Sequence, residues 1–206
     1  MEIIDISIGN YNGMRKYPSL ENYRHEFIKD YSLGDNYSLS KMTMPMHIGT
    51  HIDAPYHFIE SGIKIDAIPL GMFYGECFVA EIDSDIITKE SVVNKGIACK
   101  RILFKTKNSI IQRNGDEVLK NVYIDRSGAQ YLADIGVELV GIDYFSVDSI
   151  NIKNKNAHQI LLSEGIVILE GINLYGVEEG EYIISSFPLN VLDSEASPCR
   201  AVLIKL

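Results

Sequence analysis

The sequence contains no tryptophan and only three cysteines in 206 residues. The cysteines, at positions 77, 99 and 199, are odd in number, lie far apart and form no Cys-x-x-Cys pair. This spacing argues against a disulfide framework and against a cysteine-rich zinc site. It is typical of proteins from a reducing compartment, and we therefore expect the cytoplasm.

Basic residues and long apolar runs are also scarce. Nineteen lysines and arginines stand against 28 aspartates and glutamates, which gives a net charge of −9. Such a balance argues against a nucleic-acid partner, because phosphate binding needs a basic surface. No apolar run approaches the length of a membrane span, so a membrane partner is not expected. The opening MEIIDISIGN has no basic region before an apolar core, which predicts no signal peptide.

The length and the apolar content suit one compact domain over residues 1–206, with 46% hydrophobic and 23% charged residues. Apolar and β-branched runs alternate with short capped segments, which predicts an α/β fold with mixed β-sheets and short helices. Strands are expected at 2–8, 76–82, 101–105, 137–142, 166–170 and 199–204, helices at 88–94, 127–134 and 157–163, and a turn at Asn114-Gly115.

Residues 10–40 have little periodicity and predict a long loop with a short helix around 21–29. A loop of this length is often a lid or a binding element. Its tyrosines either line a pocket for a planar substrate or pack over the core or in a subunit interface; they are Tyr11, Tyr17, Tyr23, Tyr31 and Tyr37.

The most informative stretch is His-Ile-Gly-Thr-His-Ile-Asp-Ala-Pro-Tyr-His-Phe, residues 47–58, which places His47, His51, Asp53 and His57 within eleven residues. Imidazole and carboxylate groups are ligands for divalent metals such as Zn²⁺ or Mn²⁺. A helix would turn Asp53 away from His47, whereas an extended chain points all odd positions to one side. A straight strand would leave His47 and His51 about 13 Å apart. The chain must therefore bend, and Gly49 is the residue that permits it.

Pro55 keeps Ala54 out of helical geometry, so the extended path should continue past Asp53. The stretch is therefore interpreted as a bent strand end that presents a metal site. Neighbouring histidines can also be ordinary core or surface residues, and that alternative stays open.

A second pair of candidate ligands lies downstream, with His158 on the helix expected before Gly165 and Glu170 at the end of the following strand. A helix–turn–strand unit of this size can return Glu170 close to His158. The alternative is a packed or capping histidine and a solvated glutamate.

The stretch from His47 to Phe58 matches the HxGTHxDxPxH signature and resembles the cyclase-like metal-dependent hydrolases, a family that includes bacterial kynurenine formamidases and isatin hydrolases. The likeness continues along the chain in the family's order. It covers Gly141-Ile142-Asp143 with Ser146 and Asp148, the block from His158 to Glu170-Gly171, and Pro188 with Pro198-x-Arg200-Ala201.

The resemblance implies a swivelling β/β/α domain that forms a homodimer or homotetramer and binds one or two Zn²⁺ or Mn²⁺ ions. It implies that His47, His51 and Asp53 hold a first ion and that Asp53 bridges to a second ion at His158 and Glu170. His57 would be the acid–base residue.

The resemblance further implies hydrolysis of the C–N bond of a small amide by activated water, with an aryl formamide such as N-formylkynurenine as the expected substrate. The chain departs from the formamidases in its early loop, where Tyr17-Pro18-Ser19 stands in place of a tryptophan-proline segment. Alternatives are hydrolysis of a cyclic amide or lactone, a metal-dependent lyase or dehydratase, and a metal-dependent small-molecule binding protein without activity.

Overall fold

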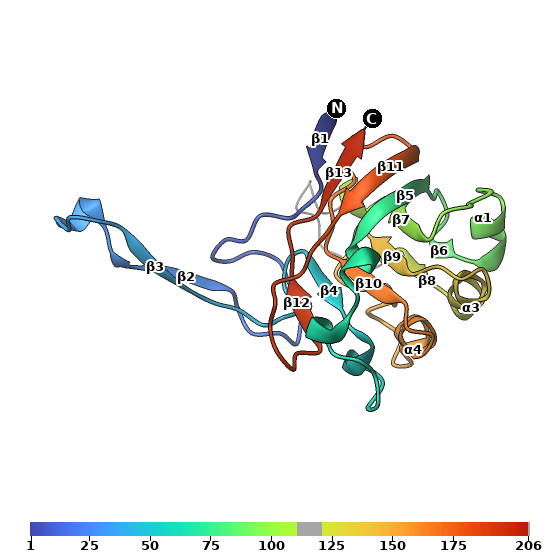
Figure 1. Ribbon diagram of the computed structural model, residues 1–206, viewed down its shortest axis with the longest axis horizontal. Helices are drawn as coiled ribbons and strands as arrows, with labels where there is room; N and C mark the ends of the chain where they lie inside the picture. Colours follow the sequence, from blue (N-terminus) through green and yellow to red (C-terminus); the bar gives the residue numbers. More distant parts are fainter. Residues whose placement is uncertain (111–120, 206) are drawn as a thin grey trace.

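A single nine-stranded sheet forms the centre of the protein, seen here in a computed structural model that describes residues 1–110 and 121–205 (Figure 1). The turn expected at Asn114-Gly115 lies outside the described residues. The strands are β1 (Glu2–Asp5), β2 (Arg24–Lys29), β3 (Leu39–Thr43), β4 (His51–Asp53), β5 (Tyr74–Glu81), β6 (Ile86–Ile87), β7 (Arg101–Lys105), β8 (Tyr123–Ile124), β9 (Leu139–Ile142), β10 (Val167–Glu170), β11 (Gly180–Ser185), β12 (Ala196–Pro198) and β13 (Val202–Lys205). The α-helices are α1 (Lys89–Val93), α3 (Arg126–Asp134) and α4 (Asn156–Ser163), and short 3-10 helices lie at Tyr31–Leu33, Pro55–His57, Ile65–Ala67 and Leu70–Phe73.

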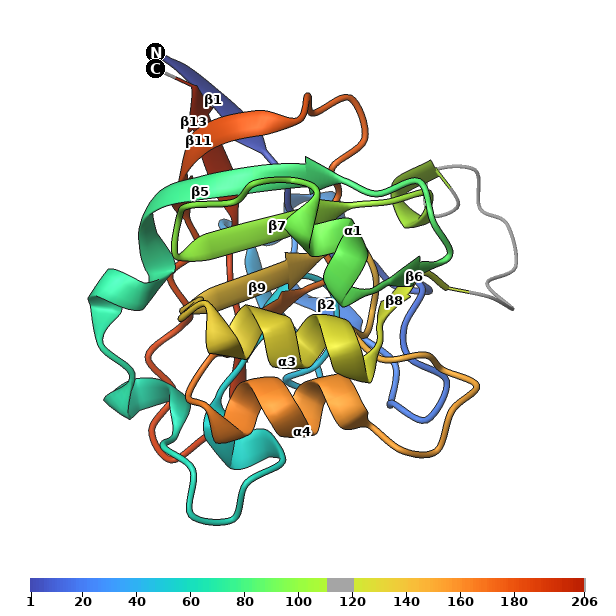
Figure 2. The same ribbon diagram turned by 90° about the vertical axis from the view of Figure 1, so that its right-hand side faces the viewer.

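The sheet is mixed, and its strand order is β1-β13-β11-β5-β7-β9-β10-β4-β12. Three neighbouring pairs are parallel, namely β5–β7, β7–β9 and β9–β10. The remaining pairs of the large sheet are antiparallel. Helices α3 and α4 lie side by side over one face of the sheet (Figure 2). The predicted single α/β domain with a mixed sheet and short helices is confirmed.

The central strands are buried on both faces, which explains their unbroken apolar sequences. Ile102, Val140 and Ile168 pack in a core cluster with residues of the helices. The alternate residues Leu103, Leu139 and Leu169 belong to a second cluster on the opposite face. That second cluster also contains Ile184 of β11 and Leu203 of β13, so the curl of the sheet brings its antiparallel part over its parallel part.

Residues 24–43, here called the arm, correct one prediction. Strands β2 and β3 pair in an antiparallel hairpin that projects away from the body of the protein (Figure 1). The helix expected around 21–29 is therefore wrong. The side chains of β3 are all exposed, and those of β2 are exposed or half-buried. Since no face is buried, the sequence carries no alternation from which a strand could be recognised.

Smaller differences concern where elements begin. Helix α3 begins one residue before Ser127, because the carboxylate of Asp125, rather than the Ser127 hydroxyl, accepts a hydrogen bond from the Gly128 N–H at 2.8 Å and caps the helix. The first strand ends at Asp5 and the last strand begins at Val202. The described chain contains no helix with the length and apolarity to cross a membrane.

Candidate metal centre

Two antiparallel neighbours, β4 and β10, build the floor of the site. His51 lies directly opposite Glu170 in their register. Opposed residues of an antiparallel pair present their side chains on the same face, and Asp53 follows on that face two residues along β4. Strand β12 pairs with the other edge of β4, so the three-residue strand is held from both sides. This pairing fixes His51, Asp53 and Glu170 relative to one another.

The bend expected at Gly49 is confirmed. Gly49 has a φ of +67°, in the left-handed region, and a Cβ at this position would come 2.3 Å from Asn10 Oδ1. The backbone also needs Gly171, since a Cβ there would lie 2.0 Å from the Gly49 carbonyl oxygen. The bend turns His47 back over β4.

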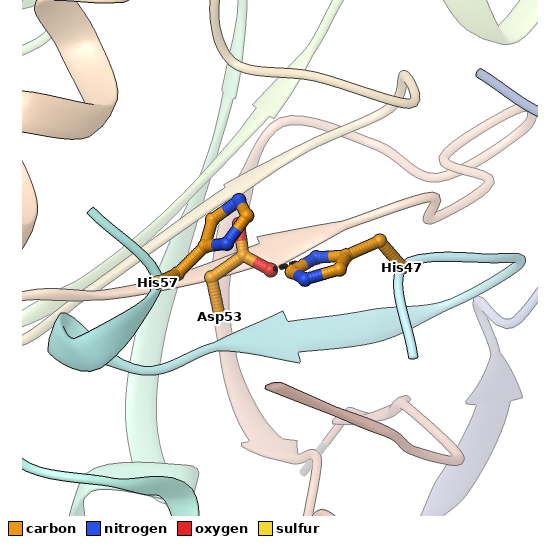
Figure 3. Close-up of side chains that lie close together, drawn as sticks. All are labelled: His47, Asp53 and His57. Atoms are coloured by element: carbon orange, nitrogen blue, oxygen red, sulfur yellow. Dashed lines mark ion pairs between the residues drawn. The ribbon is translucent and has the colours of Figure 1, made fainter. Parts of the chain in front are cut away.

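The extended path beyond Asp53 is shorter than expected. Ala54 is extended, with φ −89° and ψ 158°, but the chain then enters the 3-10 helix Pro55–His57. That turn brings the ring of His57 to 4.0 Å, centroid to centroid, from the ring of His47. The two rings flank the carboxylate of Asp53 (Figure 3).

The two oxygens of Asp53 face different histidines. Oδ1 lies 2.8 Å from His47 Nδ1 and 3.5 Å from His51 Nε2, while Oδ2 lies 3.4 Å from His158 Nε2. Glu170 closes the cluster, with Oε1 3.2 Å from His158 Nε2 and Oε2 3.5 Å from His51 Nε2. The expected return of Glu170 to His158 is thus observed, and all six residues predicted for the site lie together.

Hydrogen bonds orient two of the imidazoles. His51 Nδ1 lies 3.0 Å from the Gly49 carbonyl oxygen, which can only accept, so Nδ1 carries the proton and Nε2 turns its lone pair into the cluster. His158 Nδ1 lies 2.6 Å from Asp148 Oδ2, and its Nε2 likewise faces Asp53 and Glu170. Both rings therefore turn Nε2 towards the carboxylates of the cluster.

Burial and charge move the pKa values in this cluster in opposite directions. Burial raises the pKa of Asp53, but the positive charges of His47 and the other histidines outweigh it and bring that pKa well below its ordinary value. Burial lowers the pKa of His47, but the Asp53 carboxylate outweighs burial, and the net pKa rises from the ordinary 6.5 to about 8. For His57 burial prevails and lowers the pKa, so its imidazole is neutral at neutral pH and can accept a proton.

The donor set fits a divalent metal ion. Within the described chain, four buried atoms of the cluster face oppositely charged partners but make no well-directed hydrogen bond, namely His47 Nε2, His51 Nε2, Asp53 Oδ1 and Asp53 Oδ2. Buried polar atoms without a partner are costly unless a ligand satisfies them. Candidate ligand atoms lie within 4.8 Å of one another in two groups, His47–Asp53–His57 and His51–Asp53–Glu170. These groups share Asp53, but they divide the other residues differently from the sequence expectation, and the first group includes His57.

The cluster opens into a cavity of about 230 Å³. Its wall includes the aromatic rings of Tyr17, Phe58 and Phe145, and the Phe58 ring stacks on the ring of His158 at 4.8 Å. The cavity is small, since pockets for drug-sized ligands have about 300–1,000 Å³. Of the tyrosines in the early loop, Tyr17 lines this cavity, Tyr23 is buried in a small separate cluster, and Tyr11, Tyr31 and Tyr37 are exposed.

Sequence reasoning missed three residues around the cluster. Glu195 Oε1 lies 3.2 Å from His47 Nε2, and its distant position in the chain gave no local signal. Asp148 was noticed only as part of a motif, and Lys155 of the cavity wall was not singled out. Asp143, of the motif Gly141-Ile142-Asp143, accepts hydrogen bonds from Thr106 and Ser109.

This fold with its buried histidine–carboxylate cluster is similar to the structures of proteins described as metal-dependent hydrolases. The Cyclase family model matches residues 4–149. A kynurenine formamidase from Bacillus cereus (strain ATCC 10987 / NRS 248) is 30% identical over 98% of this chain and 97% of its own length. The structure of a predicted metal-dependent hydrolase from Bacillus stearothermophilus superposes with a TM-score of 0.85 at 30% identity, covering 98% of this chain and 97% of that one.

Isatin hydrolase A from Labrenzia aggregata shares the fold, with a TM-score of 0.86, 19% identity and coverage of 100% and 94% of the two chains. The family match extends over more than half of the sequence, and the relatives align almost end to end. The chain therefore belongs to the Cyclase family.

Proposed function

We propose that the protein hydrolyses the C–N bond of a small aryl formamide, with N-formylkynurenine as the best candidate. The observation that carries this proposal is the set of buried imidazole and carboxylate atoms that make no well-directed hydrogen bond, at the floor of a small cavity with aromatic walls. The kynurenine formamidases among its relatives support the formyl group as the target. The oxygen of water would bond to the formyl carbon, the C–N bond would break, and formate and an aryl amine would leave.

His47, His51, Asp53, His158 and Glu170 would hold one or two ions, Zn²⁺ or Mn²⁺. A bound divalent ion would supply Lewis-acid polarisation of the carbonyl and make water more acidic. His57 would take the proton of the attacking water and return it to the leaving nitrogen, a role suited to its lowered pKa. The aromatic wall would hold the ring of the substrate and exclude bulk water.

The first test measures formate and aryl amine release by the Zn- or Mn-loaded protein on a panel of aryl formamides, cyclic amides and lactones. We expect turnover of the formamides, loss of turnover after chelation, and recovery on reloading. Turnover restricted to lactones or cyclic amides, a product formed without consumption of water, or binding without turnover would each contradict the proposal.

The second test assigns His57. His57→Ala should keep its metal in elemental analysis but lower kcat by about 10²–10⁴-fold. His51→Ala should lose the metal, because it removes a ligand. His25→Ala is the matched control, since His25 lies in β2 outside the cluster, and it should keep both metal and turnover. Equal metal loss in His57→Ala and His51→Ala would make His57 a ligand.

The proposal also covers the cellular location and the oligomeric state of the enzyme. Widely spaced cysteines and an acidic composition support a cytoplasmic location. The exposed arm supports a homodimer or homotetramer, because its apolar side chains have no cover within the described chain.

A further inference from the structure

One lysine stands out in the cavity that leads to the cluster. Among the described residues that line it, Lys155 is the one lysine or arginine. We propose that Lys155 binds a carboxylate of the substrate, so that the enzyme prefers aryl formamides that carry an acidic group. This inference rests on the proposed formamide hydrolysis and specifies its substrate class.

The position of Lys155 is unfavourable for the helix that follows it. Lys155 is the N-cap residue of α4, and its side chain makes no capping hydrogen bond. The N-terminus of a helix carries partial positive charge and favours oxygen-bearing or acidic residues. A lysine here opposes the helix dipole. The stability of α4 therefore does not explain this residue, whereas recognition of an anion at the cavity wall does.

The ammonium group is held but keeps donors available. Lys155 Nζ donates to the Ser149 carbonyl oxygen at 2.9 Å and lies 5.6 Å from the centroid of the Tyr17 ring. An ammonium group has three donors, so one bond leaves two for a bound anion. The side chain is half-buried, and a charge-assisted hydrogen bond formed there is less screened than one in open solvent. Ser149 and Tyr17 thus fix a cation at the wall.

One element carries both the proposed anion site and a metal ligand. Lys155 precedes α4 and His158 lies in its first turn, three residues later. Both residues line the same cavity. The carboxylate and the scissile formamide would therefore be held at a fixed separation. The cavity of about 230 Å³ limits the rest of the substrate to about one ring with a short acidic side chain.

The experiment compares two formamides that differ only in charge, 4-(2-formamidophenyl)-4-oxobutanoate and the corresponding carboxamide. The wild type should prefer the acid in kcat/KM. Lys155→Met keeps the unbranched side chain but removes the charge, and it should raise KM for the acid by about 10–100-fold. Lys155→Arg should retain the preference. Lys153→Met is the matched control, because Lys153 is exposed and outside the cavity lining; the acid-to-amide ratio should stay as in wild type.

A measurement without turnover separates this inference from the proposed function. The aryl amine product of the acid should bind the metal-free protein, and Lys155→Met should weaken its Kd by a similar factor in calorimetry. Equal ratios and equal Kd values in Lys155→Met and wild type would overturn the inference, as would a wild type that does not prefer the acid. If neither formamide is hydrolysed, the proposed function fails instead, and the product Kd still decides whether Lys155 binds a carboxylate.

Discussion

Single hydrogen bonds decide which nitrogen each imidazole turns towards the cluster, and Asp148 is the residue that does this for His158. Its carboxylate accepts from His158 Nδ1 at 2.6 Å and from the N–H groups of Ala157 and His158 at 3.0 and 3.1 Å. The same carboxylate therefore orients the imidazole ring and gives hydrogen-bond acceptors to two backbone N–H groups in the first turn of α4. Carboxylates that hold metal-binding histidines in this way also raise their basicity.

We expect Asp148→Asn to weaken metal binding by about 10–100-fold, because the amide cannot match the charge of the carboxylate. Competition with a chelator measures this affinity. Asp134→Asn, a change at an exposed residue at the end of α3, is the control and should leave the affinity unchanged. A purely structural role would instead lower the melting temperature of the metal-free protein while leaving the metal affinity as in wild type.

At the scale of elements, Asp143 ties the end of β7 to the end of β9. It follows β9 and accepts from the N–H and hydroxyl groups of Thr106 and Ser109 at 2.6–3.1 Å. Burial raises its pKa to about 6 from the ordinary 3.8, although the hydrogen bonds from Ser109 and Thr106 oppose the rise. The folded protein therefore keeps a proton on Asp143 at pH values where the unfolded chain has released it.

The sign of the pH dependence follows from this difference. Between the two pKa values the folded state holds a proton on Asp143 that the unfolded state has released, so the contribution of Asp143 to the free energy of unfolding decreases as pH rises. The shift corresponds to a loss of about 3 kcal/mol across this window and to no further loss above it. In urea denaturation at pH 4, 5, 6 and 7, the free energy of unfolding should decrease by this amount in the wild type relative to Asp143→Asn as pH rises, because other titrating groups contribute equally to both proteins. Asp134→Asn should follow the wild type. A slope in Asp143→Asn equal to that of the wild type would refute the assignment.

The elements differed in how far the sequence could predict them. Strands β7, β9 and β10 were predictable because burial on both faces requires unbroken apolar runs. The bend at Gly49 was predictable because a straight strand would leave His47 and His51 too far apart for one ion, and glycine bends the chain most easily. The arm was not, since exposed strands leave no periodic signal. The contact of Glu195 with His47 depends on the pairing of β12 with β4 across the fold, which no local pattern records.

At the scale of the whole molecule, the arm presents large apolar side chains to solvent. They include Phe27, 54% exposed, and Leu33, 77% exposed. A two-stranded hairpin is marginally stable alone and gains from packing against a further surface. A second copy of the chain would provide that surface and would explain the proposed homodimer or homotetramer.

Light scattering coupled to gel filtration should therefore give a mass at least twice 23.1 kDa for the wild type. The double substitution Phe27→Ser and Leu33→Ser should lower the mass to that of a monomer, because it removes apolar contact area. Leu192→Ser is the control, because Leu192 is 71% exposed outside the arm, and it should not change the mass. A monomeric wild type would contradict the expectation.

The position of β4 in the sheet has a consequence for biosynthesis. Residues 51–53 are bracketed by residues 168–170 on one edge and 196–198 on the other. The growing polypeptide therefore emerges with His51 and Asp53 long before their strand partners exist. The cluster can reach its final geometry only after residues 196–198 have left the ribosome, so an ion held by His51 and Asp53 would be taken up after most of the fold has been synthesised.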